Sequence, residues 1–163
     1  MVPADFEVPE RLDGDGFHLR PLTVGDLIKD YDAVMSSADH LVGVLNPGSN
    51  WPHGLTLETD LIDLAWHQRE FRLRHSFAYT MMSTDEAVCL GCCYIYPSDD
   101  PAYDAMAFYW VRASVLAEGL DERLGAAFRG WLASDWPFKR IAYPGRDVSW
   151  DRWLGQPPDE APS

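Results

Sequence analysis

The sequence predicts an α+β domain whose sheet is mostly antiparallel. Strand and helix patterns follow one another in the order strand, helix, helix, three strands, helix, strand. The first two of the three central strand patterns are separated only by a short turn, which is typical of a hairpin. The last two strands are joined through a helix, which allows one parallel pair in the sheet.

Length and charge limit the function classes. The chain has 163 residues, with 26 Asp and Glu against 13 Lys and Arg, a formal net charge of −13. A chain of this length favours one domain with a sizeable core. The acidity argues against a nucleic-acid binder and against a polybasic membrane anchor. No apolar stretch is long enough for a transmembrane helix, and no signal peptide is visible at the N-terminus, so we expect a cytoplasmic protein.

The first strand is expected over residues 17–22, where apolar and polar residues alternate after a loose lead-in over residues 1–16. Thr23 then begins a helix, and Asp26 three residues later resembles a capping box. A loop over residues 43–54 follows, rich in Pro and Gly. Thr56 is the expected N-cap of the next helix, which ends near His75. One stripe of that helix, apolar except for Gln68, consists of residues that recur at a spacing of three or four: Leu57, Leu61, Leu64, Gln68 and Phe71.

Three strands are expected next, and the third is apolar almost throughout, so both of its faces should be covered. The elements after them are a helix with a buried stripe, a short strand ended by Pro-Gly, and a last turn that carries two tryptophans. The expected ranges are 76–83, 88–96, 103–113, 119–133, 140–143 and 150–153. We expect one domain over residues 17–154 and a disordered acidic tail over residues 155–163.

Two segments resemble the GNAT superfamily of N-acetyltransferases. Residues 17–27 (FHLRPLTVGDL) are similar to the first strand and helix of many members. Residues 111–124 (VRASVLAEGLDERL) match the spacing of the family pattern V-x-P-x-x-[RQ]-x-x-G-x-[GA]-x-x-L, and Val111, Gly119, Leu120 and Leu124 have the expected residue types. The resemblance covers about residues 17–146 and implies the GNAT fold.

The resemblance implies direct acetyl transfer from acetyl-CoA to an amine of a small molecule or peptide, without a covalent enzyme intermediate. A helix N-terminus preceded by a glycine suits a diphosphate, because it offers free backbone N–H groups and a partial positive charge. Backbone amides near Val111 and Arg112 would polarise the thioester. The implied cofactor-binding residues are Trp110, Val111, Arg112, Leu116, Gly119, Leu120, Asp121 and Arg123.

The same segment departs from the family pattern. Leu116 stands in place of Arg or Gln, Asp121 in place of Gly or Ala, and Glu118 adds a second carboxylate. Carboxylates at this point would repel a diphosphate. A second hypothesis is therefore a degenerate GNAT-fold module that binds a ligand or partner without transferring an acetyl group. A third is a dimerisation or scaffold domain.

Acetyl transfer needs a group that removes the ammonium proton and benefits from an acid that protonates the leaving thiolate. By position, Tyr143 is the candidate acid, with a buried aromatic role as the alternative. Glu70 is the candidate base, and His75 and three tyrosines are further possibilities. Those tyrosines are Tyr94, Tyr96 and Tyr109.

The candidate substrate-binding residues are Trp51, Tyr94 and Tyr109. Trp51 lies in the loop where the family places a substrate-facing wall, and an aromatic wall near acids suits a cationic amine. The alternative is a tryptophan that only fills the core. Dimers are common in the resembling family, so a homodimer is possible.

Three clustered cysteines, Cys89, Cys92 and Cys93, suggest a metal or redox site. Strand alternation would place Cys89 and Cys93 on one face and Cys92 on the other. No second ligand pair follows at zinc-site spacing, so we predict buried, inert thiols and no metal.

Overall fold

The computed structural model describes residues 1–155. Residues 156–163, which form most of the tail expected over residues 155–163, lie outside the described residues. The elements, in chain order, are β1 (Leu12–Asp13), β2 (Phe17–Pro21), the 3-10 turn η1 (Val24–Asp26), α1 (Leu27–Met35), α2 (Ala38–Leu41), α3 (Leu57–Leu73), β3 (Phe77–Ser83), β4 (Cys89–Tyr96), β5 (Ala105–Val111), the 3-10 turn η2 (Ala113–Glu118), α4 (Leu120–Asp135), β6 (Ile141–Ala142) and α5 (Trp150–Trp153).

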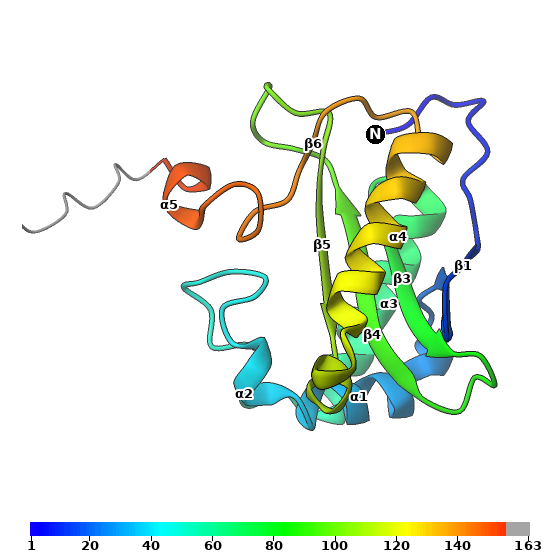
Figure 1. Cartoon of the computed structure of the whole chain (residues 1–163), viewed down its shortest axis with the longest axis vertical. Helices are drawn as coiled ribbons and strands as arrows, with labels where there is room; N and C mark the ends of the chain where they lie inside the picture. Colours follow the sequence, from blue (N-terminus) through cyan, green and yellow to red (C-terminus); the bar gives the residue numbers. More distant parts are fainter. Residues whose placement is uncertain (156–163) are drawn as a thin grey trace, which may run out of the picture.

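The six strands form one mixed sheet in sequence order, from β1 to β6. All neighbouring pairs are antiparallel except β5 and β6, which pair in parallel. The predicted α+β class and the single predicted parallel pair are therefore confirmed. The helix that joins β5 to β6 is α4, which crosses one face of the sheet (Figure 1).

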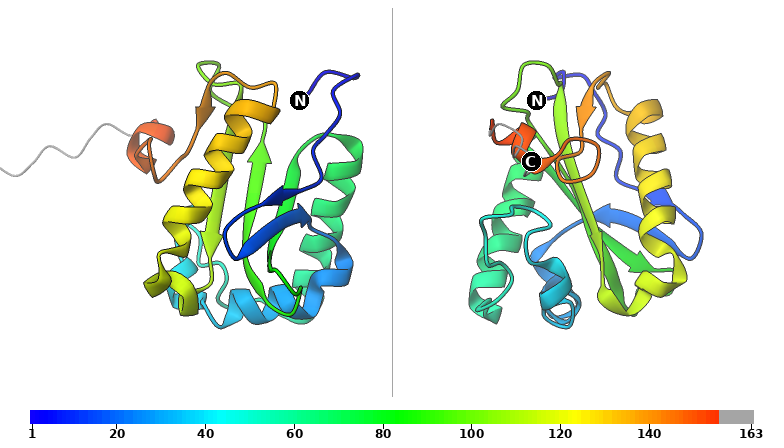
Figure 2. Two further views of the ribbon diagram at one scale, coloured as in Figure 1. Left: turned by 45° about the vertical axis from the view of Figure 1, so that its right-hand side comes forward. Right: turned by 60° about the vertical axis from the view of Figure 1, so that its left-hand side comes forward.

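Two apolar layers enclose the sheet. α4 packs on one face, where Leu124 and Phe128 are fully buried against Tyr109 and its neighbours. α1 and α3 cover the other face, where Val34 and Leu64 contact the second layer (Figure 2). The alternation of side chains along β3, β4 and β5 divides their residues between these layers.

Local sequence signals set the helix starts. The Asp26 carboxylate accepts a hydrogen bond from the Thr23 N–H at 2.9 Å, as the capping pattern predicts. The Thr56 hydroxyl accepts from the Thr59 N–H at 3.2 Å and caps α3. The short helix α2 and the turn η2 have no counterpart among the expected elements, because neither is long enough to show a periodic pattern.

The lead-in over residues 1–16 packs more closely than its composition suggests. β1 pairs with β2 through Leu12 opposite Leu19. The Tyr79 hydroxyl donates to the Pro9 carbonyl at 2.6 Å, and the Arg74 guanidinium donates to the Pro3 and Phe6 carbonyls. These bonds come from residues far along the chain, which local sequence patterns do not reveal.

The predicted facing of the cysteines is wrong for Cys89. Cys93 packs in the layer below α4, but Cys89 and Cys92 both pack in the layer below α1 and α3. The register between β3 and β4 shifts at this point, where Met81 pairs with Gly91 and Met82 with Cys89. A β-bulge adds one residue and so reverses the alternation. All three thiols are free and buried, as predicted.

Candidate active site

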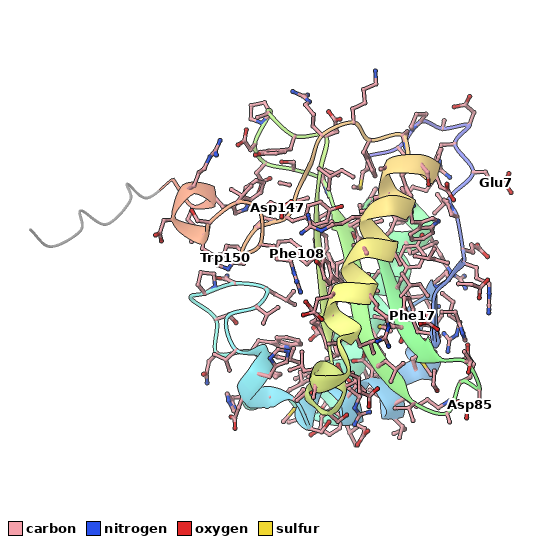
Figure 3. The ribbon with its side chains drawn as sticks, viewed as in Figure 1. Glu7, Phe17, Asp85, Phe108, Asp147 and Trp150 are labelled. Atoms are coloured by element: carbon pink, nitrogen blue, oxygen red, sulfur yellow. The ribbon has the colours of Figure 1, made fainter. Side chains whose placement is uncertain are left out.

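The strands β5 and β6 diverge soon after they meet. They pair only through Ala105 with Ile141 and Met106 with Ala142. A hollow of about 370 Å³ opens beyond this point, and we call it the cleft. Its lining consists of Val42, Gly43, Val44, Ala107, Phe108, Tyr109, Pro144, Gly145, Arg146 and Trp150. Phe108 of β5 and Trp150 of α5 stack with ring centres 6.1 Å apart and lie together at one side of the sheet (Figure 3).

Arg146 reaches across the cleft from the loop after β6. Its Nη2 atom donates to the Tyr109 carbonyl at 3.1 Å, and its two terminal nitrogens donate to the Asp121 carboxylate at 2.8 Å. The guanidinium carbon lies 3.6 Å from the centre of the Tyr109 ring. Asp121 belongs to the first turn of α4, so its negative charge at that helix start is balanced by Arg146.

The segment that resembles a diphosphate loop is a compact turn. Its N–H groups at Val115 and Gly119 donate within the turn, to the Arg112 and Leu116 carbonyls. The Ala113 N–H donates to the Ser37 hydroxyl at 2.9 Å. These three N–H groups are therefore engaged within the protein.

The side chains of the same turn are also engaged. The Arg112 guanidinium donates to Asp32, Ser36 and the Cys89 carbonyl. Arg123 donates to the Glu118 carbonyl at 2.7 Å. Leu116, which stands where the family pattern has a polar residue, packs against the core below α4. Gly119 caps α4 with a φ of +70°, a left-handed conformation that favours glycine.

The second hollow, which we call the acidic cavity, lies between α1, α3 and β4. Its volume is about 220 Å³. It contains three carboxyl groups, a histidine and three large aromatic rings. The lining consists of Leu22, Asp30, Val34, Leu41, Gly43, Leu45, Asn46, Ser49, Trp51, Asp60, Asp63, Leu64, His67, Tyr94 and Tyr96.

Several titratable groups that line the acidic cavity have shifted pKa values. Burial, and then the charge of Asp63, raise the pKa of Asp60 to about 6. Burial raises the pKa of Asp30 well above its usual range, although this carboxylate accepts a hydrogen bond from the Cys92 thiol at 3.3 Å. Burial lowers the pKa of His67 to about 4, so this ring is neutral at pH 7.

The two predicted catalytic residues lie apart from each other. Glu70 contacts Arg69 and His75 at the end of α3 and is not among the residues that line either hollow. Tyr143 directly precedes Pro144 of the cleft and is buried below α4, with the Arg129 guanidinium 3.9 Å from its ring centre. Burial raises the pKa of Tyr143 to about 12, which keeps its phenol protonated at neutral pH.

The three predicted substrate-binding residues divide between the two hollows. Trp51 and Tyr94 line the acidic cavity, and Tyr109 lines the cleft. The Tyr94 hydroxyl accepts a hydrogen bond from the Trp110 indole at 3.2 Å. Among the remaining residues predicted to bind the cofactor, Val111 and Leu120 are buried.

Sequence reasoning missed Asp30, Asp60, His67 and Arg146. The sequence contained a signal for two of them, because Asp60, Leu64 and His67 follow one another at helical spacing on one face of α3. Leu64 belongs to the predicted apolar stripe, so polar residues beside it on that face were candidates for a buried polar site. No local pattern indicates Arg146, whose partner Asp121 lies 25 residues earlier in the chain.

Comparisons with solved structures show the fold. The chain is similar to ribosomal-protein-S5-alanine acetyltransferase from Vibrio fischeri, with a TM-score of 0.67 and 13% identity over 89% of this chain and 80% of that one. It is similar to a ribosomal L7/L12 α-N-protein acetyltransferase, RimL, in complex with coenzyme A, with a TM-score of 0.67 and 15% identity over 82% and 73%.

A third similar structure is the microcin C7 self-immunity acetyltransferase MccE in complex with acetyl-CoA and AMP, with a TM-score of 0.67 and 11% identity over 83% and 73%. No family model matches the chain, and no curated protein matches its sequence. The protein has the GNAT fold.

Proposed function

We propose that this chain, which has the GNAT fold, transfers an acetyl group from acetyl-CoA to an amine. The observation that carries the proposal is that the cleft beside β5 and the acidic cavity are neighbours, because Gly43 lines both. The amine nitrogen would attack the thioester carbonyl, so that a C–N bond forms and the C–S bond breaks. The amine loses a proton in this reaction, and the leaving thiolate gains one.

The divergence of β5 and β6 supports the cleft as the place where acetyl-CoA, the acetyl donor, would bind. Where β6 no longer pairs with β5, residues 107–109 of β5 line the cleft, and the unpaired strand edge would offer backbone groups to an extended ligand. The turn that contains Arg112 and Leu116, and the helix start with Gly119, Leu120, Asp121 and Arg123, are the proposed diphosphate end. Trp110 and Val111 lie at the end of β5 that joins this turn.

Tyr143 is the proposed acid for the leaving thiolate. It directly precedes Pro144 of the cleft, and its phenol is protonated at neutral pH, which fits this role. That Glu70 acts as the base remains a prediction.

A cytoplasmic location and a homodimer are proposed from the sequence alone. No helix among residues 1–155 is long and apolar enough to cross a membrane.

Acetyl-CoA binding tests the proposal directly. At 100 times the Kd, we expect about 2.7 kcal/mol of added stability, which raises the Tm by about 5–10 °C in a domain of this size. Thermal shift and calorimetry provide the measurement, and ATP, which lacks the thioester arm, is the control ligand. The absence of binding at millimolar acetyl-CoA would contradict the proposal.

Asp121→Asn should tighten acetyl-CoA binding about fivefold, a gain of about 1 kcal/mol. The change removes a carboxylate from the first turn of α4 and frees the Arg146 guanidinium from its present partner. Glu122→Gln is the matched control, because it removes the same charge from an exposed neighbour in the same turn. Equal or weaker binding by Asp121→Asn, measured by calorimetry, would show that the diphosphate does not lie at this helix start.

A GNAT-fold binding module without transferase activity is the second candidate. It is favoured by the engaged N–H groups of the turn before α4 and by Arg146, which crosses the cleft. This candidate predicts that amines bind to the acidic cavity while acetyl-CoA binds weakly or not at all.

A further inference from the structure

We infer that the acidic cavity holds a cationic group of the acceptor as an anchor, and that a second amine of the same molecule receives the acetyl group. The acceptor class is therefore a small diamine. The anchor site stands on the cavity alone, whereas the assignment of the second amine rests on the proposed function.

Two polar atoms of the cavity lack a partner among the described residues. They are Asp60 Oδ2 and His67 Nδ1, and both are buried. The whole Asp60 residue is only 3% exposed, and it is one of the residues that line the cavity. Buried polar atoms in native proteins nearly always have a hydrogen-bond partner, so an unpartnered carboxylate oxygen in a residue that lines a hollow indicates a missing donor.

The charge around this oxygen selects a cation. Asp30 faces the cavity from α1, while Asp63 and His67 share α3 with Asp60. On the β4 side the titratable groups are Tyr94 and Tyr96, and the thiol of Cys92 on the same strand donates to Asp30. No lysine or arginine is among the described residues that line the cavity.

Aromatic rings complete the surroundings of the expected cation. Tyr94 and Tyr96 stack with an angle of 6° between their planes, and Trp51 lines the cavity from the loop before α3. A ligand ammonium near such ring faces gains a cation–π attraction in addition to its hydrogen bond. An ammonium group therefore fits the cavity better than a neutral hydroxyl or amide does.

The volume of the cavity limits the size of the ligand that it can hold. Its volume of about 220 Å³ is far larger than the roughly 10–15 Å³ that one water needs. It is smaller than the roughly 300–1,000 Å³ of pockets for drug-sized molecules. A short alkylammonium chain is the matching class.

The anchored ammonium is not the nucleophile. A carboxylate next to an ammonium group stabilises its protonated form and so keeps its lone pair bound to hydrogen. Acetyl transfer needs a free lone pair, which a second amine outside the cavity supplies. A third hollow lies beside both sites, because it shares Leu45 and Tyr96 with the cavity and Phe108 and Trp150 with the cleft.

Calorimetry with three probes of similar length tests the anchor. The probes are 1,4-diaminobutane, butylamine and the neutral 1,4-butanediol. We expect both amines to bind and the diol to show no binding at the same concentrations. Asp60→Asn should weaken amine binding at least tenfold, while Asp99→Asn, which removes an exposed carboxylate outside the cavity, should leave it unchanged. Binding of the diol as tight as that of the amines would overturn the anchor site without any variant.

The pH dependence provides a second readout. Because the pKa of Asp60 is raised to about 6, amine affinity should rise as the pH increases from 5 to 7. Asp60→Asn should flatten this rise if the carboxylate of Asp60 accepts the ammonium. A rise that persists unchanged in Asp60→Asn would overturn its role.

Thiol release with acetyl-CoA tests the second amine. We expect turnover with 1,4-diaminobutane, at most a tenth of that rate with butylamine, and competitive inhibition of the diamine reaction by butylamine. Equal turnover of the two amines would overturn the anchor role. Amine binding that depends on Asp60 but yields no thiol release would overturn the proposed acetyl transfer and support the cation site.

Discussion

Gly91→Ala should lower the free energy of unfolding by at least about 3 kcal/mol. A Cβ atom at Gly91 would lie 2.0 Å from the Trp110 carbonyl oxygen, which belongs to the neighbouring strand β5. Both groups are backbone atoms of a paired sheet, so the contact is relieved only when the strands move apart. Urea unfolding of the variant and of the wild type measures the difference.

Gly130→Ala is the matched control for this substitution. Gly130 lies within α4, and a Cβ atom there would meet no other atom within 4 Å. The change should stabilise the protein by up to about 1 kcal/mol, because alanine favours the helix more than glycine does. A loss below about 1 kcal/mol in Gly91→Ala would mean that the bulge adapts easily to a side chain.

Arg20→Ala should lower the free energy of unfolding by about 2–4 kcal/mol. Arg20 donates to both oxygens of Asp26, at 2.8 and 3.1 Å, and also to the Glu86 carboxylate. Asp26 is only 6% exposed, so the substitution leaves a buried carboxylate without its cation. Arg11→Ala is the control and should leave the stability nearly unchanged, because Arg11 and its partner Asp13 have side chains that are 57% and 70% exposed.

The pH dependence of unfolding provides a second test of Arg20. The hydrogen bonds from Arg20 are the main cause that lowers the pKa of Glu86 from 4.5 to about 2. The Glu86 carboxylate therefore adds stability above pH 4.5, and this contribution is lost as the pH falls from 4.5 to 2. Arg20→Ala should flatten the stability profile in that window. An equal acid sensitivity of Arg20→Ala and wild type, measured by urea unfolding, would contradict this role of the pair.

The sequence alone predicted most of the scaffold, because those features depend on near neighbours in the chain. The Thr56 cap and the periodic apolar residues predict α3, and the alternation in residues 76–83 predicts β3. The parallel placement of the last strand follows from the helix that precedes it. The family resemblance, not a local pattern, suggested Trp51 for a substrate-facing wall, and Trp51 and Tyr94, both predicted to bind substrate, line the acidic cavity.

Only the tertiary structure decided where the charges and thiols of the site lie. The bulge before Gly91 moved Cys89 to the face of Cys92, because one extra residue reverses the alternation of a strand. The partner of Asp121 is Arg146, from a loop after another strand. Asp60 became a buried, unpartnered group because α1, α3 and β4 close around it. Spacing along the chain determines helices and strands, whereas the burial and pairing of a carboxylate depend on residues that only the complete fold brings together.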